Sequence, residues 1–449
     1  MTSIANTLKL LLASLALGAA IACGGGEWGE SWGWEGGNGN GGGPNPGPNP
    51  IGGIVAPVSP IRLQSPYGTC WAHGALASME SNWMKSNPGA GKDLSEWHLA
   101  WFAYTPNPVN GMPAFSKPTQ TSPFDFGGDR TRAIAILSRG TGPVDEASAQ
   151  YQNTKPYPQS SIPTGNEARV LGLKDAFMYD SLAKEDVKSM VQTYGALNIA
   201  VYWDDANYSD ANNAYRYIGS ETTNHELNIV GWNDNFDRTK FPTQPSANGA
   251  WIVRNSWGPD WGDKGYFYMS YDTVIDDIAS FVPDSLPAGQ KIYQYDTLGL
   301  GYATSYDTGT AWFSNIFTAT GNESIRAVAF YSMEANAQYD IYIRSGVTGD
   351  PGTGAQVHGP QSGTLAKPGY HQITLSSPVS IGAGKFAVIV KLRGRSTDDL
   401  VPLTYARRGY SDAWRPTAGV GFASEDGTSW DDVAEQDDGI CLKAFTVPR

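Results

Sequence analysis

The pattern of apolar and polar residues changes along the chain from helical spacing to strand-like runs. Apolar residues recur every three or four positions from Cys70 to Asn87, and shorter runs of the same kind cover residues 95–104 and 130–138. From Ala196 onward, runs such as ALNIAVYW, NHELNIVGW and GYFYMSY suit β-strands. This part of the pattern therefore predicts a lobe of helices followed by a lobe of strands.

The segment PDSLPAGQK, at residues 283–291, interrupts this order and marks a domain boundary. Beyond it, short strand-like runs such as AQYDIYIRSG and FAVIVKLRG are separated by loops rich in Gly, Pro and Asp. In the first of these runs, Tyr339, Ile341 and Ile343 alternate with Asp340, Tyr342 and Arg344, as a strand with one buried face should. We therefore expect an α+β fold class, with a two-lobed domain at residues 53–283 and an all-β sandwich at residues 290–449.

Cys70 stands where a turn gives way to the first predicted helix. Pro66 and Gly68 favour the turn, and Thr69 is a residue type that caps helix N-termini. The unpaired N–H groups and the dipole at this end of a helix stabilise a thiolate relative to the thiol. Cys70 is therefore a candidate nucleophile.

Three other residues supply what a nucleophilic thiol requires. His225 opens the strand NHELNIVGW and is the candidate base. Asn255, in WIVRNSWG, can accept a hydrogen bond from one imidazole nitrogen and leave the other facing the sulfur. Gln64 lies six residues before Cys70, so its amide can join the Cys70 backbone N–H in an oxyanion hole.

Together, and in this order, these segments resemble the papain-like cysteine peptidases over residues 53–280. QSPYGTCWA is similar to the family's segment from oxyanion-hole glutamine to nucleophile, NHELNIVGW to its histidine strand, and NSWGPDWGDKGYFYMS to its asparagine segment. The resemblance implies a papain-like fold of a helical lobe and a β lobe. It also implies a cysteine-type endopeptidase whose catalytic residues are Gln64, Cys70, His225 and Asn255, without cofactor or metal.

The same resemblance assigns residues that contact substrate or cover the site. DFGGDRTRAIAIL is similar to the family's glycine pair before a helix, which implies that Gly127 and Gly128 lie along the substrate backbone. Trp257 is implied to cover the contact between Asn255 and His225. LSEWHL and GPVDEASAQYQ also follow the family pattern.

Two positions near the nucleophile depart from that pattern. Tyr67 stands where members commonly place a disulfide cysteine, and His73 stands where an aromatic residue is usual. A basic histidine one turn from Cys70 is expected to perturb that thiol or a substrate subsite. The stretch before Cys70 is also shorter than the usual inhibitory proregion, so the means of controlling activity is left open.

The first 52 residues carry targeting features. Residues 1–22 combine Lys9 with an apolar run too short for a comfortable membrane span, and the sequence AIA precedes Cys23, so we interpret them as a signal peptide. The arrangement resembles a bacterial lipoprotein signal, in which Cys23 becomes the lipidated N-terminus and anchors the protein to a membrane. Simple secretion is the alternative. Residues 23–52 form a Gly/Pro/Asn-rich tether.

Composition narrows the classes of partner. The formal net charge of -13 argues against nucleic acid as a partner. The chain has 3 cysteines, and with roles assigned to Cys23 and Cys70, Cys441 is expected to be a buried core residue. No metal-ligand spacing and no nucleotide-binding motif appears in a fitting context.

These observations indicate an exported, envelope-anchored or secreted cysteine endopeptidase that acts on protein or peptide substrates. The C-terminal domain resembles the lectin-like domain behind some bacterial papain-like peptidases, so a surface glycan is a candidate ligand. A surface adhesin with an inactive peptidase scaffold is the alternative from another class. Transpeptidation, in which an amine replaces water, is a third interpretation, and the sequence leaves the substrate side chains undetermined.

Overall fold

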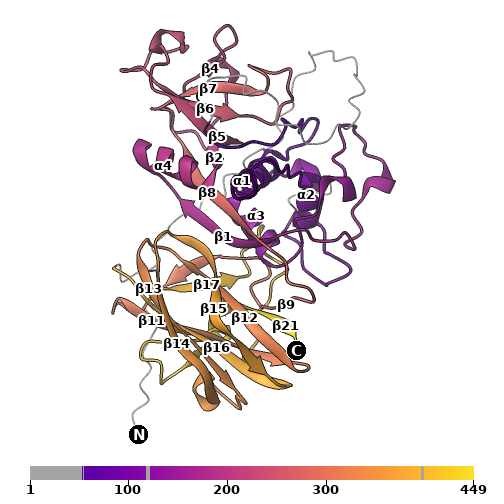
Figure 1. The fold of residues 1–449 in the computed structure, drawn as a ribbon, viewed down its shortest axis with the longest axis vertical. Coiled ribbons are helices and arrows are strands. Elements are labelled where there is room, and N and C mark those ends of the chain that lie inside the picture. The colour runs from indigo at the N-terminus through magenta and orange to yellow at the C-terminus, as the bar shows by residue number, and fades with distance from the viewer. Residues whose placement is uncertain (1–52, 54, 118–121, 396–398) are drawn as a thin grey trace. The chain divides into compact units, whose positions relative to one another are not determined.

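The computed structural model describes residues 53, 55–117, 122–395 and 399–449. The predicted signal peptide, Cys23 and the tether lie outside the described residues. The chain divides into two compact units, one that ends at Leu286 and one that comprises Pro287–Arg449 (Figure 1).

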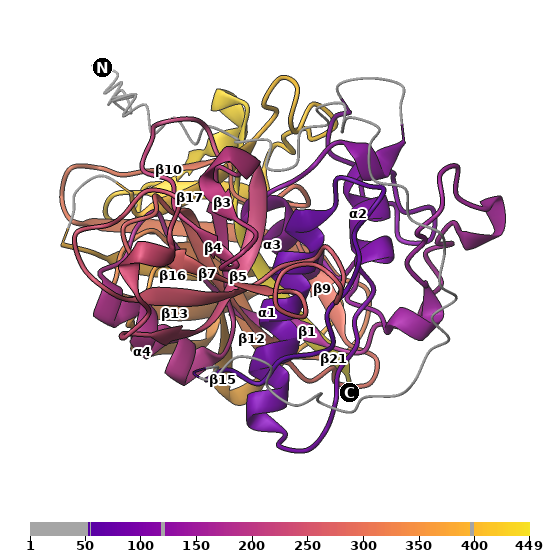
Figure 2. The ribbon, with the colours of Figure 1, turned by 90° about the horizontal axis from the view of Figure 1, so that it is seen from above.

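The first unit contains the α-helices α1 (Cys70–Ser86), α2 (Glu96–Tyr104), α3 (Arg130–Ser138) and α4 (Lys184–Tyr194). Helix α1 lies between strands of the β lobe on one side and helices α2 and α3 on the other (Figure 2). Because it is covered on both sides, nearly every residue of its first four turns is buried, although the helix is rich in Ala, Ser and Gly. The start of α1 is therefore fixed by contacts from both lobes.

Local sequence explains where the other helices begin. Ser95 caps α2 by accepting a hydrogen bond from the His98 N–H, and Asp129 caps α3 in the same way with the Arg132 N–H. Helix α4 ends at Gly195, whose φ of 93° favours glycine. Short 3₁₀ helices are η1 (Pro123–Asp125), η2 (Glu146–Ser148), η3 (Gln159–Ser161), η4 (Asp205–Asn207), η5 (Arg238–Lys240), η6 (Pro351–Thr353) and η7 (Val433–Gln436).

The strands of the first unit pair in the order β3-β4-β7-β6-β5-β2-β8-β1. All of these pairs are antiparallel except β4 with β7. Strand β5 alternates as an interior strand should: Leu227 and Ile229 join the core of the β lobe, while the Asn228 side chain reaches the Gly74 carbonyl of α1. The strands are β1 (Gly172–Tyr179), β2 (Leu197–Val201), β3 (Tyr208–Ser209), β4 (Ala214–Tyr215), β5 (His225–Asn233), β6 (Ala250–Arg254), β7 (Tyr266–Ser270) and β8 (Asp276–Asp284).

The second unit is built from β-strands and the short helices η6 and η7. Its strands are β9 (Lys291–Tyr293), β10 (Tyr302–Thr304), β11 (Thr310–Ala319), β12 (Glu323–Ser332), β13 (Ala337–Ser345), β14 (Ala355–Leu365), β15 (Gly369–Ile381), β16 (Gly384–Arg393), β17 (Val401–Tyr405), β18 (Gly421–Ser424), β19 (Asp431–Asp432), β20 (Asp438–Ile440) and β21 (Leu442–Pro448).

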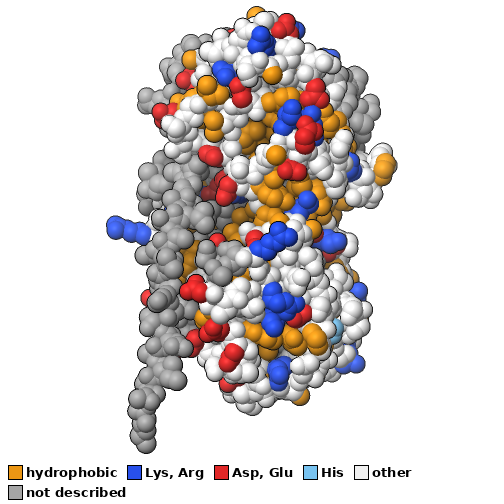
Figure 3. Space-filling view, turned by 90° about the vertical axis from the view of Figure 1, so that its left-hand side faces the viewer, with side chains coloured by type: hydrophobic (Ala, Val, Ile, Leu, Met, Phe, Trp, Pro, Cys, Tyr) orange, Lys and Arg blue, Asp and Glu red, His pale blue; other side chains and the backbone are white. Residues whose placement is uncertain are grey.

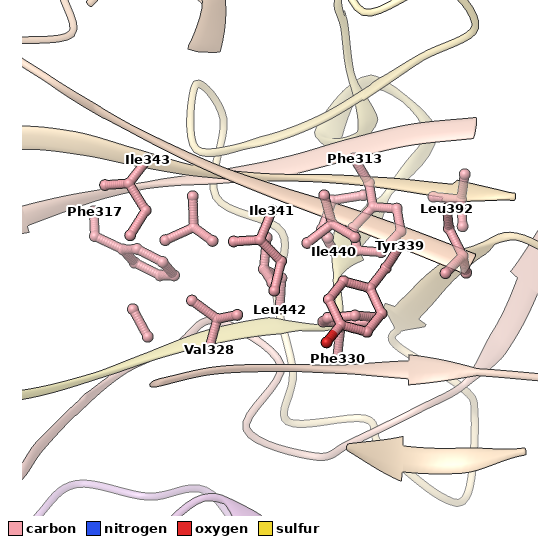
Figure 4. Close-up of a cluster of buried hydrophobic side chains, with 14 of the residues drawn as sticks. Phe313, Phe317, Val328, Phe330, Tyr339, Ile341, Ile343, Leu392, Ile440 and Leu442 are labelled. Carbon is pink, nitrogen blue, oxygen red and sulfur yellow. The ribbon is translucent and has the colours of Figure 1, made fainter. Parts of the chain in front are cut away.

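Two sheets of this unit enclose its main core. One has the order β14-β13-β16-β11-β18-β19 and the other β15-β12-β21-β9, with a smaller sheet β10-β17-β20 beside them. Ile341 and Phe313 from the first sheet and Val328 and Leu442 from the second point toward one another (Figure 4). Cys441 is buried, as predicted, and its sulfur lies 3.6 Å from the Gly299 carbonyl oxygen.

The described surface mixes charges of both signs. Figure 3 shows Lys and Arg side chains interspersed with Asp and Glu around apolar patches on the face it displays. Among the described residues, none of the helices combines the length and apolarity needed to span a bilayer. The same residues contain no group of three or more His, Cys, Asp and Glu side chains placed to hold a metal ion.

Candidate active site

The residue predicted as nucleophile occupies the first position of α1. Cys70 is fully buried, and the backbone N–H of Glu226, at the start of β5, donates to its sulfur at 3.3 Å. This contact joins the helical lobe to the β lobe at the residue next to His225. A donor at that position also favours negative charge on the sulfur.

The hydrogen bonds around His225 define its tautomer. Its Nε2 lies 2.9 Å from Asn255 Oδ1, and the same oxygen accepts the Ser256 backbone N–H at 2.8 Å. Because a backbone N–H needs an acceptor, the atom that faces both donors is the amide oxygen, so Nε2 of His225 carries the hydrogen. The Nδ1 atom is then left to exchange a proton with a nucleophile.

The surroundings of His225 favour its neutral form. Burial lowers the pKa of His225 to about 4, and the hydrogen bond with Asn255 offsets part of that effect. The Trp257 ring stacks on the imidazole with centroids 4.8 Å apart and an interplanar angle of 25°, and Trp203 approaches it at 6.1 Å. The structure therefore places Trp257 over one face of the imidazole, and its predicted contact with substrate stays a prediction. Trp203 carried no sequence signal that we recognised.

Gln64 is fixed from several directions. Its side-chain Oε1 accepts the Ser256 hydroxyl at 2.7 Å, which orients the amide, and its Nε2 donates to the Tyr67 carbonyl at 3.1 Å. Its backbone N–H donates to the Ser256 carbonyl at 2.7 Å. The amide nitrogen has two hydrogens, so one remains for an oxyanion beside the Cys70 N–H. Ser256 was missed from the sequence, although it directly follows Asn255.

The glycine pair packs beside the nucleophile. Gly127 has a φ of 66°, and its carbonyl accepts the Tyr104 hydroxyl at 2.9 Å. A Cβ added to Gly128 would lie 2.3 Å from the ring of Trp71, the residue after Cys70. Both positions therefore favour glycine, one for its backbone conformation and one for close approach. Their contact with substrate stays a prediction.

Two residues near Cys70 differ from what the sequence suggested. The hydroxyl of Thr69 does not cap α1, because it pairs with the Tyr151 hydroxyl at 2.5 Å instead. His73 is buried, its Nδ1 lies 3.0 Å from the Thr69 carbonyl, and burial lowers its pKa to about 3. An uncharged His73 does not supply the basic group that we expected near the nucleophile.

The first unit also contains a group of acids with buried carboxyl oxygens, Glu80, Glu96 and Glu146. The carboxylate of Glu80, in α1, accepts hydrogen bonds from the Ser59 hydroxyl and from the Leu94 N–H, the latter at 2.7 Å. Glu96 Oε2 and Glu146 Oε2 are buried and find no hydrogen-bond donor among the described residues. Burial, together with the neighbouring carboxyl charges, raises the pKa values of all three acids.

These carboxyls predict a pH dependence of stability. A carboxyl whose pKa is raised in the folded state favours folding while it is protonated and loses that contribution as pH rises. Glu226 adds to the effect, since burial raises its pKa to about 8. The buried side chains of His73, His98 and His225 have lowered pKa values. They make the folded state more stable as pH rises, but only below their unfolded pKa of 6.5. We therefore expect the melting temperature of the first unit to fall from about pH 6.5 to 9.

Differential scanning calorimetry across that pH range measures this effect. Glu146→Gln removes one titrating carboxyl and is expected to flatten the decline, whereas Glu185→Gln, at an exposed position of α4, should leave it unchanged. A melting temperature that rises from pH 6.5 to 9 would show that these carboxyls do not control stability.

Taken together, a cysteine at a helix N-terminus, a histidine at the start of β5 paired with the asparagine that follows the neighbouring strand β6, and an oriented glutamine amide are typical of thiol-dependent hydrolases. The family described as papain family cysteine protease matches residues 54–282, about half of the chain. The chain therefore belongs to the papain family of cysteine proteases. A second family, described as lectin like domain, matches residues 292–446.

Curated relatives match about half of the chain. The viral cathepsin of Choristoneura fumiferana defective polyhedrosis virus is 25% identical over 241 residues, which cover 53% of this chain and 62% of the relative. Fruit bromelain of Ananas comosus is 25% identical over 221 residues, which cover 47% of this chain and 52% of the relative. The chain thus spans less than two thirds of the length of these relatives.

Two solved structures match most of the length of the chain. The clostridial cysteine protease Cwp84 after propeptide cleavage aligns with a TM-score of 0.75 and 22% identity, covering 87% of this chain and 97% of that chain. The cysteine protease and lectin-like domains of Cwp84, a surface layer associated protein of Clostridium difficile, align with a TM-score of 0.72 and 22% identity, covering 87% and 86%. This likeness confirms the predicted α+β fold class and the order of a papain-like domain before a β domain.

Proposed function

We propose that this chain is an exported cysteine endopeptidase that hydrolyses peptide bonds of its substrates with Cys70 as the nucleophile. The observation that carries the proposal is the convergence of both lobes on one sulfur: the Glu226 N–H reaches Cys70, and the adjacent His225 is held by Asn255. Gln64, oriented by Ser256, supplies the oxyanion donor. Membership of the papain family supports the same reaction class.

In the first step, the Cys70 thiol passes its proton to Nδ1 of neutral His225, and the resulting thiolate attacks the carbonyl carbon of the substrate peptide bond. The carbonyl oxygen becomes an oxyanion, which accepts hydrogen bonds from Gln64 Nε2 and the Cys70 backbone N–H. Protonated His225 then gives its Nδ1 proton to the departing amine nitrogen, and the carbon–nitrogen bond breaks. An acyl-enzyme remains, with the acyl carbon bonded to sulfur.

In the second step, a water molecule replaces the amine. Neutral His225 accepts one proton from this water through Nδ1 while the water oxygen attacks the acyl carbon. The same two donors hold the oxyanion, and the carbon–sulfur bond breaks as the second product leaves. Asn255 keeps the imidazole in the orientation that serves both steps, since it fixes Nε2–H.

Labelling with an epoxide probe for active-site thiols, followed by peptide mapping, tests this proposal. We expect modification at Cys70 and not at Cys441, because burial raises the pKa of the Cys441 thiol well above its usual range and leaves little reactive thiolate. Labelling should be lost in His225→Ala, because the thiolate is no longer supported by an imidazolium. Equal labelling of the variant, or no labelling of the unmodified protein, would contradict an activated Cys70.

We also propose that the chain is exported and held at the bacterial envelope through a lipid on Cys23. The support is the signal-like sequence of residues 1–22 and the position of Cys23 directly after it. Metabolic incorporation of a labelled fatty acid is expected in the natural chain and not in Cys23→Ser. Incorporation into both proteins would place the lipid elsewhere, and incorporation into neither would favour simple secretion.

The match of residues 292–446 to a lectin-like family favours a second candidate function, the binding of a surface glycan. The full chain with Cys70→Ala, applied to a glycan array, tests this function separately from cleavage. Binding of defined glycans is expected if the second unit positions the peptidase on a surface. Binding together with no peptide hydrolysis by the natural chain would instead favour the adhesin alternative.

A further inference from the structure

One phenol hydroxyl connects the two ends of the segment that carries the proposed oxyanion donors. The Tyr151 hydroxyl lies 2.6 Å from the Gln64 carbonyl oxygen and 2.5 Å from the Thr69 hydroxyl oxygen. A carbonyl only accepts, so Tyr151 donates to Gln64 and accepts from Thr69. The Tyr151 hydroxyl therefore links Thr69 to Gln64 through two consecutive hydrogen bonds.

The two partners of Tyr151 adjoin the two oxyanion donors. Gln64 bears the side-chain donor itself, and Thr69 immediately precedes Cys70, which bears the backbone donor. A nearby residue of the same loop reinforces the link, because the Asn153 amide donates to the Leu63 carbonyl at 2.6 Å and the Ser65 carbonyl at 2.7 Å. The 151–153 loop thus holds residues 63–69 from outside the helix.

Tyr151 is itself fixed in place. Its backbone N–H donates to Glu146 Oε1 at 2.7 Å, and its ring meets the edge of His73 at 5.0 Å and Trp97 at 5.4 Å. Edge-to-face aromatic contacts at these distances restrict the orientation of a ring. The hydroxyl therefore has a defined position relative to Gln64 and Thr69.

We propose that Tyr151 is a positioning residue that sets the spacing between the Gln64 amide and the Cys70 N–H. The inference rests on the proposed peptidase function and adds a residue to it. An oxyanion hole works only when both donors reach the same oxygen at about 2.7–3.1 Å. A misplacement of about 1 Å can cost up to about 100-fold in rate, so loss of the link lowers turnover without removing a reacting group.

Tyr151→Phe keeps the ring and deletes both hydrogen bonds. Peptide hydrolysis needs the oxyanion hole, whereas alkylation of the thiolate by iodoacetamide forms a carbon–sulfur bond and expels iodide without any oxyanion. We therefore expect kcat for a peptide to fall by about 10- to 100-fold with little change in KM. The iodoacetamide rate should stay within about twofold, since it reports the thiolate and not the oxyanion hole.

A matched control and a second variant make the test specific. Tyr271→Phe removes a phenol hydrogen bond to Asp234 elsewhere in the same unit and should change neither rate. Thr69→Val removes only the hydrogen bond from the Thr69 hydroxyl to Tyr151, and it should also lower kcat. The double variant Thr69→Val with Tyr151→Phe should lose less than the sum of the two single effects on the activation free energy, because both act through one link.

Several outcomes would overturn the inference. An unchanged kcat in Tyr151→Phe would show that the link does not position the donors. An equal fall in the hydrolysis and alkylation rates would place the effect on the thiolate or on the fold. Fully additive losses in the double variant would show that the two hydroxyls act independently. Failure of the proposed function is distinguishable, because the natural chain would then hydrolyse no peptide.

Discussion

Cys70→Ala is expected to reduce peptide hydrolysis by at least about 10⁴-fold, the largest effect of any single substitution in this chain. The substitution removes the atom that bonds to the acyl group, and no neighbouring group can replace it. The methyl of alanine fits the space of the thiol, so the fold should persist. Measurement of kcat/KM with a fluorogenic peptide and of the melting temperature checks both expectations.

Cys441→Ala is the matched control for this prediction. It removes a buried thiol of the same kind from the second unit, where the sulfur contacts only a backbone carbonyl among the contacts described for it. Peptide hydrolysis should be unchanged in this control. Retention of more than a small fraction of activity in Cys70→Ala, after contaminating peptidases are excluded, would assign the reaction to another nucleophile.

His225→Ala is expected to produce the second largest loss, about 10²- to 10⁴-fold in kcat, because proton transfer is removed from both chemical steps. Asn255→Ala should lose less, since the imidazole is still present and Trp257 still covers one of its faces. What Asn255→Ala removes is the acceptor that fixes Nε2–H. Steady-state kinetics of the two variants shows which substitution causes the larger loss of kcat.

His358→Ala, in the second unit, is the control for loss of a histidine. Its ring is paired with Gln361 at 3.2 Å and has no part in the proposed reaction, so kcat should not change. A loss in Asn255→Ala that exceeds the loss in His225→Ala would contradict the assigned roles. It would indicate that Asn255 contacts the reacting groups directly.

The structure changes the role of one residue that the sequence had assigned locally. Thr69 has the right residue type and position for a helix cap, yet its hydroxyl bonds to Tyr151, which follows it by 82 positions. The local rule failed because a tertiary partner engages the same hydroxyl. That competition also reveals the link between Gln64 and the start of α1.

The burial of His73 is a second example of a tertiary effect. The sequence suggested a basic group one turn after Cys70, but the pKa of a histidine depends on what surrounds it. The ring lies against Tyr151 and hydrogen-bonds to the Thr69 carbonyl, and burial holds it neutral. The pattern of the helix showed where His73 stands and could not show which groups cover it.

The sequence by itself determined the order of the lobes, the start of the first helix at Cys70, the separate β domain and the residue types of the candidate site. These features depend on short-range periodicity and on motifs whose neighbours lie close in the chain. The boundary near residue 287 and the strand alternation in β13 follow from the same local pattern.

Only the tertiary structure decided how those residues are oriented. The tautomer of His225 depends on Ser256 and Asn255 together, and the amide of Gln64 depends on Ser256. Burial and the nearby charge of Glu96 raise the pKa of Glu80. The contacts of His225 with Asn255 and of Gln64 with Ser256 join segments distant along the chain. Hydrogen-bond direction and burial are set by such long-range packing, which a local pattern of apolar and polar residues does not contain.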